Sequence, residues 1–240
     1  MSDADFEYSN LSGRSRGAFL TLAGRVLPGI TRVHQDVAPF AEAWRRDNLA
    51  ALAGDRPLWV ALGDSLTQGI GAPSHDRGWV GQVRDRLAAQ GFDYAVLNLG
   101  VSGATTRDVL DRQLPALASV SARPVHPPIA LVTLMIGSND LLRPANRRLL
   151  PARLGEVLEA LPRGAIVTTM PNPSAAARRA NEVLLGIAPG RGLVVAELRD
   201  PRTSSWRGKL AADHFHPNER GYAALADVVG DVVVSAARAA

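Results

Sequence analysis

Short apolar segments alternate with longer helical patterns along most of this 240-residue chain, and no other feature constrains the fold as strongly. From residue 57 onwards, short apolar runs predict five buried strands, at Leu58–Leu62, Tyr94–Leu99, Ile129–Ile136, Ala165–Met170 and Leu193–Leu198. Helical patterns follow them, over Trp79–Ala89, Thr106–Leu114, Leu149–Leu161, Ser174–Ile187 and Asn218–Ala237. This alternation predicts an α/β fold whose five-stranded parallel sheet is covered by helices on both sides.

The first 55 residues have a different pattern and are expected to form an N-terminal helical extension to a domain spanning residues 56–240. Apolar residues recur at helical spacing from Phe19 to Leu27, and Pro28-Gly29 is expected to interrupt that helix. A second helix is expected over about 39–52. The apolar face favours packing against the sheet. A lid or a dimer contact is the alternative role.

The composition is that of a globular protein and excludes several classes of function. The chain has no Cys, and therefore no disulfide framework, thiol nucleophile or Cys-ligated zinc. No apolar run reaches the length of about 20 residues that a membrane-spanning helix needs. Because the acidic start does not resemble a signal peptide, a cytoplasmic protein is predicted.

The basic residues do not predict nucleic-acid binding. Lys209 is the only Lys among the 27 basic residues, and the net charge is only +4. The Arg residues are scattered in short doublets instead of being clustered in one segment. An electrostatic footprint for nucleic acid would be a concentrated basic face, so no such partner is expected.

Polar segments stand where the predicted sheet would place a ligand. Three follow strands and carry glycine, and a fourth precedes the last helix; they are Gly63–Gly69, Asn98–Ala104, Gly137–Asp140 and Asp213–Asn218. Ligands of parallel α/β sheets bind beyond the carboxyl ends of the strands. Each segment alone would be ordinary turn chemistry. Together they can bring a hydroxyl, amide donors, an imidazole and a carboxylate to one edge.

These residue types suit nucleophilic catalysis. The hydroxyl of Ser65 needs a neighbouring imidazole to take its proton, and His216 is the candidate. That imidazole needs a partner on its other nitrogen, and Asp213, three residues earlier, can reach it across one tight turn. An oxyanion needs fixed donors, for which the N–H groups of Gly103 and Ser65 and the amide of Asn139 are candidates.

The four segments, in this order and with this approximate spacing, resemble the sequence blocks of the SGNH hydrolases, also called the GDSL esterase/lipase family. The matching residues are Gly63-Asp64-Ser65-Leu66 with Gly69, Asn98 through Gly103, Gly137 with Asn139-Asp140, and Asp213 with His216-Pro217-Asn218. The resemblance covers about residues 57–237. It implies a flavodoxin-like three-layer α/β/α sandwich, a triad of Ser65, His216 and Asp213, and an oxyanion hole from Ser65, Gly103 and Asn139. The N-terminal extension lies outside it.

Other interpretations of the same residues remain open. Ser102 also follows a strand, although the G-x-S-x-G pattern of a nucleophile elbow fails there, as it does at Ser65. Asp213, His214 and His216 have spacing seen in some metal sites, but a third firm ligand is lacking. A non-catalytic, Arg-rich binding module is a further alternative. One of the arginines between Arg143 and Arg148 is hypothesised to meet an anionic part of the substrate, against the simpler interpretation of a solvated loop.

The sequence therefore predicts a serine hydrolase that cleaves carboxylic esters through an acyl-enzyme, without a metal or an organic cofactor. Thioesterase, carbohydrate deacetylase and acyltransferase chemistry on the same triad are the nearest alternatives. The expected partner is a small ester molecule, whose pocket is predicted to be formed by loops 70–78, 142–150 and 171–180. The acyl and alcohol specificity and the oligomeric state do not follow from the sequence.

Overall fold

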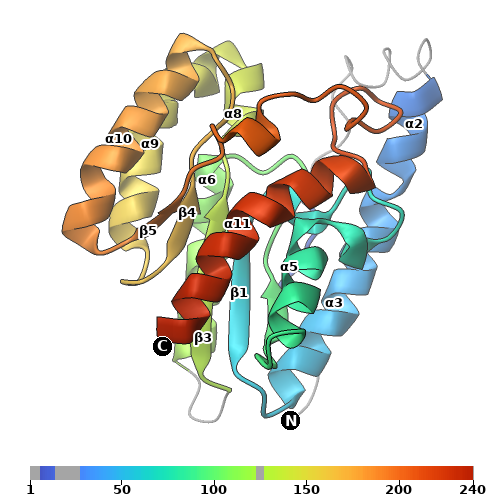
Figure 1. Cartoon of the computed structure of the whole chain (residues 1–240), viewed down its shortest axis with the longest axis vertical. Coiled ribbons are helices and arrows are strands. Elements are labelled where there is room, and N and C mark those ends of the chain that lie inside the picture. The colour runs from blue at the N-terminus through green and yellow to red at the C-terminus, as the bar shows by residue number, and fades with distance from the viewer. Residues whose placement is uncertain (1–5, 14–27, 123–126, 240) are drawn as a thin grey trace.

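The computed structural model of the chain describes residues 6–13, 28–122 and 127–239. Its centre is a parallel sheet in the order β2-β1-β3-β4-β5 (Figure 1). The strands are β1 (Leu58–Gly63), β2 (Ala95–Asn98), β3 (Ile129–Met135), β4 (Ile166–Thr168) and β5 (Val194–Ala196). This strand order is that of flavodoxin-like sheets. The predicted fold class, a five-stranded parallel sheet flanked by helices, is confirmed.

The main helices before, between and after the strands are α2 (Pro28–Gln35), α3 (Val37–Ala53), α5 (Trp79–Ala88), α7 (Leu114–Ser121), α9 (Pro144–Ala160), α10 (Ala175–Arg191) and α11 (Glu219–Ala239). Shorter turns are α4 (Ser65–Gln68), η2 (His75–Arg77), α6 (Thr106–Asp108), the π-helical η3 (Val109–Gln113), α8 (Ser138–Leu142) and η4 (Pro201–Thr203). The helix expected over 106–114 thus continues through η3 and α7. The helix expected over 19–27 lies outside the described residues. Pro28 begins α2, as a residue without an N–H can do in a first helical turn.

The alternating side chains of β1 separate two apolar cores. Leu58, Val60 and Leu62 face the layer of α7, α9 and α10, whereas Trp59 and Ala61 face α5 and α11. Thr133 is the one polar side chain in β3, and its hydroxyl accepts a hydrogen bond from the indole N–H of Trp59, at 3.0 Å. The three layers therefore follow from the apolar strand segments, and they leave the strand ends free for polar residues.

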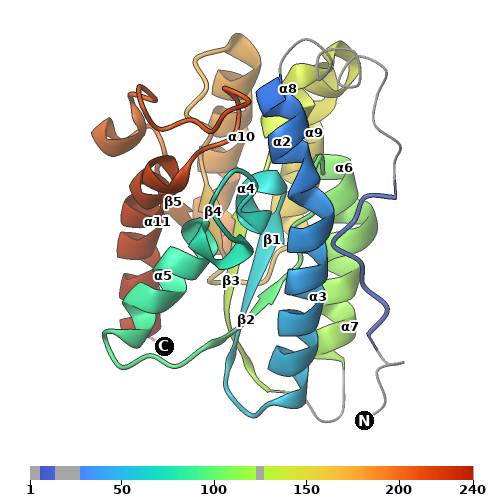
Figure 2. The ribbon, with the colours of Figure 1, turned by 90° about the vertical axis from the view of Figure 1, so that its right-hand side faces the viewer.

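Helix α3 and the segment 6–13 cover the β2 edge of the sheet and the loop that follows it (Figure 2). The side chain of Asn48 on α3 accepts from the N–H of Asn98 and donates to its carbonyl, at 2.8 Å in both directions. This amide replaces a neighbouring strand at the end of β2. The extension thus packs on the sheet, as expected, and the division of the chain at residue 55 stays a prediction.

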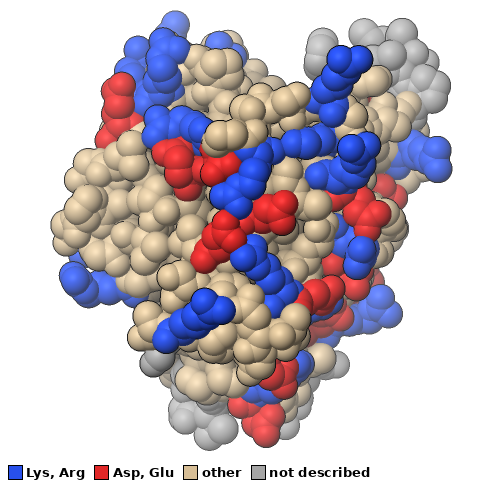
Figure 3. Space-filling view, in the orientation of Figure 1, with Lys and Arg blue, Asp and Glu red and all other residues tan. Residues whose placement is uncertain are grey.

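The surface charges on the face of α5 and α11 lie in mixed groups (Figure 3). Arg86 and Arg202 both contact Asp231, at 2.5 and 2.6 Å, and Arg77 contacts Glu219 at 2.7 Å. This face therefore presents paired charges and not a basic stripe. None of the helices that the structure describes has the length and apolar character needed to span a membrane.

Candidate active site

Three residues from two distant parts of the chain form a continuous line of hydrogen bonds at the carboxyl edge of the sheet. Ser65 Oγ lies 3.0 Å from His216 Nε2, and His216 Nδ1 lies 2.6 Å from Asp213 Oδ2. The side chains of His216 and Asp213 are only 12% and 8% exposed, so water has little access to their mutual contact. The structure therefore brings together the three residues that the sequence predicts as nucleophile, base and orienting acid.

A capped turn holds Ser65 in place. β1 ends at Gly63, and Asp64 is the N-cap of α4, accepting a hydrogen bond from the N–H of Leu66 at 2.9 Å. The carboxamide of Gln113 on η3 exchanges two hydrogen bonds with the backbone of Gly63, at 2.8 and 2.7 Å. The backbone on the strand side of Ser65 is thus fixed from two directions.

The acid and the base share one tight loop. Asp213 Oδ1 accepts from the N–H groups of Phe215 and His216, both at 3.0 Å, while Oδ2 contacts the ring. Burial alone would raise the pKa of Asp213, but the hydrogen bonds from His216 and the two N–H groups outweigh it and leave the pKa below its usual value. Asp213 therefore stays ionised beside the imidazole.

The loop approaches the nucleophile turn so closely that Gly71 is required. Gly71 has φ +95°, and a Cβ there would lie 2.6 Å from the Pro217 carbonyl oxygen and 3.0 Å from His216 Cβ. The hydroxyl of Tyr222 on α11 donates to the carbonyl of Ile70 at 2.7 Å and holds this crossing from the other side. The distance between Ser65 and His216 is thus set by backbone packing.

The predicted oxyanion donors lie around the same turn. Asn139 Nδ2 donates to the carbonyl of Ala104 at 2.9 Å and lies 3.4 Å from Asp64 Oδ2, so this amide sits between the Gly103 loop and the residue before Ser65. Gly103 has φ +78°, which directs its N–H as few other residues could. Within the described part of the chain, no protein group accepts from the backbone N–H of Ser65 or of Gly103.

Two buried carboxyl groups support these loops. Burial, opposed by the Leu66 N–H and reinforced by Asp140, raises the pKa of Asp64 to about 7. Burial likewise raises the pKa of Asp140, whose carboxylate accepts from the N–H and the hydroxyl of Thr106, at 3.0 and 2.8 Å. Asp64 caps its own turn and Asp140 ties its segment to Thr106, so both groups hold the loops of the site in place.

A network of buried carboxamides behind the site was not predicted. Asn10 Nδ2 donates to the backbone carbonyls of Asn98 and Gly100, at 2.9 and 2.8 Å, and the backbone carbonyl of Asn10 accepts from Gln68 Nε2 at 2.8 Å. Gln68 Oε1 in turn accepts the N–H of Ser102 at 2.7 Å, one residue before Gly103. Single polar residues carry no periodic signal, so only the fold shows that Asn10, Asn48 and Gln68 meet.

A cavity of about 550 Å³ opens beside Ser65. Its walls are mostly apolar and come from the ends of β3 and β4, α8, and the segments 170–174 and 206–217; they include Met135, Ile136, Leu142, Met170, Trp206 and Phe215. The predicted loops 142–150 and 171–180 each contribute to it. The predicted wall 70–78 is wrong, because those residues pack against the His216 loop and α3 instead.

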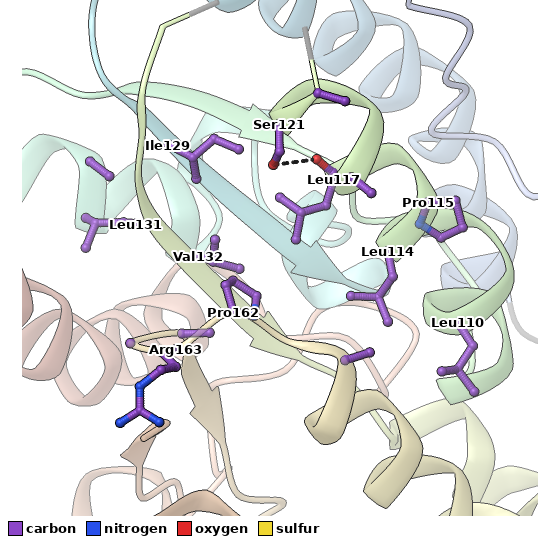
Figure 4. A pocket seen from close by; sticks show the side chains of 16 residues that line it. Leu110, Leu114, Pro115, Leu117, Ser121, Ile129, Leu131, Val132, Pro162 and Arg163 are labelled. Carbon is purple, nitrogen blue, oxygen red and sulfur yellow. Dashed lines mark hydrogen bonds between the residues drawn. The ribbon is translucent and has the colours of Figure 1, made fainter. Parts of the chain in front are cut away.

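A larger cavity, about 950 Å³, lies near the amino ends of β3 and β4 and away from Ser65 (Figure 4). Of the described residues that line it, only Ser121 and Arg163 have polar side chains, and the Ser121 hydroxyl donates to the carbonyl of Leu117 at 3.0 Å. The part of its wall that the structure describes therefore brings together no acid, base and nucleophile. The cavity at Ser65 is the candidate active site.

The alternative assignments gain no support from the contacts. No histidine in the described ranges hydrogen-bonds the hydroxyl of Ser102, whose N–H is bound to Gln68. Among residues 6–13, 28–122 and 127–239, no three His, Asp or Glu side chains are grouped so that they could hold a metal ion. His214 lines the cavity without joining a ligand cluster.

A family match covers more than half of the chain and decides which family the chain belongs to. Residues 61–224 match the family described as GDSL-like Lipase/Acylhydrolase. The chain belongs to this family. The predicted SGNH/GDSL membership is thereby confirmed, and the expected class, an esterase- or lipase-type hydrolase, agrees with it. The curated Esterase TesA of Pseudomonas aeruginosa is 39% identical over 84 residues, which are 35% of this chain and 38% of that protein.

Solved structures share the fold of this GDSL-like chain. A lipase/acylhydrolase from Enterococcus faecalis is 23% identical with a TM-score of 0.59, over 75% of this chain and 96% of its own. A TesA structure gives the same identity and TM-score over 75% and 99% of the two chains. AlinE4, an SGNH-hydrolase family esterase, is 25% identical with a TM-score of 0.52, over 76% and 97%. Residues before position 61 lie outside the family match.

Proposed function

We propose that this chain hydrolyses carboxylic esters through an acyl-enzyme on Ser65. The observation that carries the proposal is the unbroken hydrogen-bond line from Ser65 Oγ through His216 to Asp213, at the wall of an apolar cavity. An isolated Ser hydroxyl is a weak nucleophile, and a neighbouring imidazole with an ionised partner is what activates it.

The reaction proceeds in two halves. Ser65 Oγ attacks the acyl carbon while its proton passes to His216 Nε2, and the imidazolium then gives this proton to the departing alcohol oxygen. Water next attacks the acyl carbon while His216 Nε2 takes its proton. The imidazolium then returns this proton to Ser65 Oγ as the bond between Oγ and the acyl carbon breaks, and the carboxylic acid leaves. Asp213 stays ionised throughout, which fixes the ring orientation and stabilises the imidazolium.

The oxyanion of each tetrahedral intermediate is assigned to three donors. These are the N–H groups of Ser65 and Gly103, which have no protein acceptor in the described ranges, and the amide of Asn139. The bond from Asn139 to the Ala104 carbonyl orients this amide before substrate arrives. Donors fixed in advance stabilise developing charge without reorganisation at the moment of reaction.

The test is hydrolysis of 4-nitrophenyl acetate, butyrate and octanoate by the wild type and by Ser65→Ala, each with and without EDTA. Chelator-insensitive turnover that disappears in Ser65→Ala is expected. Ser102→Ala is the matched control and should retain activity, because the Ser102 hydroxyl also follows a strand but hydrogen-bonds none of the histidines that the structure describes. Equal activity in the wild type and Ser65→Ala would refute the proposal, and loss only with EDTA would indicate a metal hydrolase.

A further inference from the structure

We propose that Arg147 forms an anion subsite in the cavity beside Ser65, so that the preferred ester carries a carboxylate or phosphate group. This inference rests on the proposed ester hydrolysis and adds the charge class of the substrate. The sequence offers three basic candidates in this region, Arg143, Arg147 and Arg148, and the structure selects one. Only Arg147 lines the cavity that also contains Ser65.

The charge of the cavity wall is one-sided. Among the described residues that line the cavity, Arg147 is the only Arg or Lys, and none is Asp or Glu. The remaining walls are apolar side chains, hydroxyls, Asn172 and His214. Arg147 is itself exposed, so its guanidinium lies at the wall of this cavity in contact with solvent, and an anionic group of a ligand bound there can pair with it.

The backbone holds the guanidinium of Arg147 at one nitrogen. Its Nε donates to the carbonyl of Leu141 at 2.8 Å, and its backbone N–H donates to the carbonyl of Arg143 at 2.8 Å. No carboxylate in the described ranges pairs with it, in contrast to Arg77, Arg86 and Arg202. The two Nη groups therefore remain available for the two-pronged contact that a guanidinium makes with a carboxylate or phosphate.

Two exposed apolar side chains in the cavity wall indicate that the ligand also has an apolar part. Leu142 is 58% exposed and Phe215 is 47% exposed, and both line this cavity. Large apolar side chains at a site are covered when an apolar portion of a ligand lies on them. The substrate that fits is therefore amphipathic, with an apolar chain and an anionic group that reaches Arg147.

The binding test uses Ser65→Ala, so that it does not depend on turnover. Octanoate, octyl phosphate and octanol are titrated, with the fluorescence of Trp206 in the cavity wall as the signal. Octanoate or octyl phosphate should bind, and Arg147→Gln in the same background should weaken that binding about 10–100-fold, as expected for a charge-assisted contact. Octanol should be affected less than twofold. The inference would be overturned if octanoate and octyl phosphate bound equally well to Ser65→Ala with and without Arg147→Gln, or if neither anion showed saturable binding to Ser65→Ala.

The kinetic test compares 4-nitrophenyl butyrate with the 4-nitrophenyl half-ester of adipic acid, whose acyl chain ends in a carboxylate. Arg147→Gln should lower kcat/KM for the half-ester about 10–100-fold and leave the neutral ester within twofold. Arg147→Lys should recover part of the loss, because it keeps the charge but not the planar fork. Arg148→Gln is the matched control and should change neither substrate.

The outcomes separate the two proposals. Equal losses on both substrates in Arg147→Gln would indicate a structural role and overturn the subsite. Unchanged kinetics on the half-ester, together with unchanged octyl phosphate binding, would overturn it as well. If the wild type hydrolysed neither ester, ester hydrolysis would be contradicted instead. The binding test on Ser65→Ala would still decide whether Arg147 holds an anion.

Discussion

Replacing Asn10 with Ala tests whether the segment 6–13 supports the candidate oxyanion loop. The Asn10 amide donates to the carbonyls of Asn98 and Gly100 and accepts a longer bond, 3.3 Å, from Asn48. Asn10 is 2% exposed, so water cannot replace these partners without a structural change. The substitution therefore leaves buried backbone groups to find new partners.

The loss of unfolding free energy in Asn10→Ala follows from the hydrogen bonds that each partner keeps or loses. The carbonyl of Asn98 keeps its bond from Asn48 at 2.8 Å, so it stays paired. The carbonyl of Gly100 loses the only protein donor found for it in the described ranges, and leaving such a group unpaired costs about 1–3 kcal/mol. Adding about 1 kcal/mol for the other lost bonds, Asn10→Ala should lower the free energy of unfolding by about 2–4 kcal/mol.

Denaturant unfolding followed by tryptophan fluorescence measures this change, and kcat on a short ester measures its effect on the site. We expect kcat to fall more than KM rises, because the Gly100–Gly103 loop loosens while the cavity walls stay in place. Ser9→Ala is the matched control, since Ser9 is exposed in the same segment and should cost less than about 0.5 kcal/mol. A loss no larger for Asn10→Ala than for Ser9→Ala would refute the reasoning.

Three further predictions concern the site itself. Asn139→Ala should remain folded by circular dichroism and lose about 10²–10³ in kcat, and near wild-type turnover would remove Asn139 from the oxyanion hole. Asp213→Asn should lower kcat by about 10²–10⁴ with little change in KM, because the imidazole loses the partner that fixes its tautomer. The raised pKa of Asp64, about 7, means that folding favours its protonated form, so the stability from this group is present at acid pH and is lost as the pH rises through 7. Wild type should therefore lose on the order of a few kcal/mol of unfolding free energy between about pH 4 and 8 that Asp64→Asn does not lose, and parallel pH profiles of the two proteins would contradict this.

The sheet was predictable because its strands are encoded by local apolar runs. Leu58–Leu62 is a continuous apolar run between Pro57 and Gly63, and because both of its faces are buried it shows none of the polar–apolar alternation of a surface strand. The helix after β2 was predicted too short: the chain continues beyond Leu114 into α7, whose first turn accommodates Pro115, a residue that usually marks a helix boundary. The strand order could not be read from the sequence residue by residue, and it came from the resemblance to a family.

The residues of the candidate site were predictable for a different reason. Ser65, Asn139 and His216 each stand in a segment whose polar and glycine residues have no role in the apolar cores. The parallel sheet brings the segments of Ser65 and Asn139, which follow β1 and β3, to one edge, whereas His216 is placed by the packing of its loop against Gly71. The cavity walls were predicted less well, because Trp206 and Phe215 stand in irregular segments without a periodic pattern, and their positions depend on how the His216 loop closes over β3 and β4.

The N-terminal residues contribute to the site although they lie outside the family match. The edge of a sheet exposes backbone groups that would otherwise pair with water or another chain. Here the side chain of Asn48 pairs with the end of β2, and Asn10 pairs with the loop that leads from it to Gly103. Because Gln68 then joins Asn10 to the N–H of Ser102, the geometry of the candidate oxyanion loop depends on residues about 90 positions earlier in the chain. The sequence block Asn98–Gly103, which resembles one of the family, identifies Gly103 as a candidate oxyanion donor. The contacts of the segment 6–13 and of α3 explain how the loop that carries Gly103 is held in place in this protein.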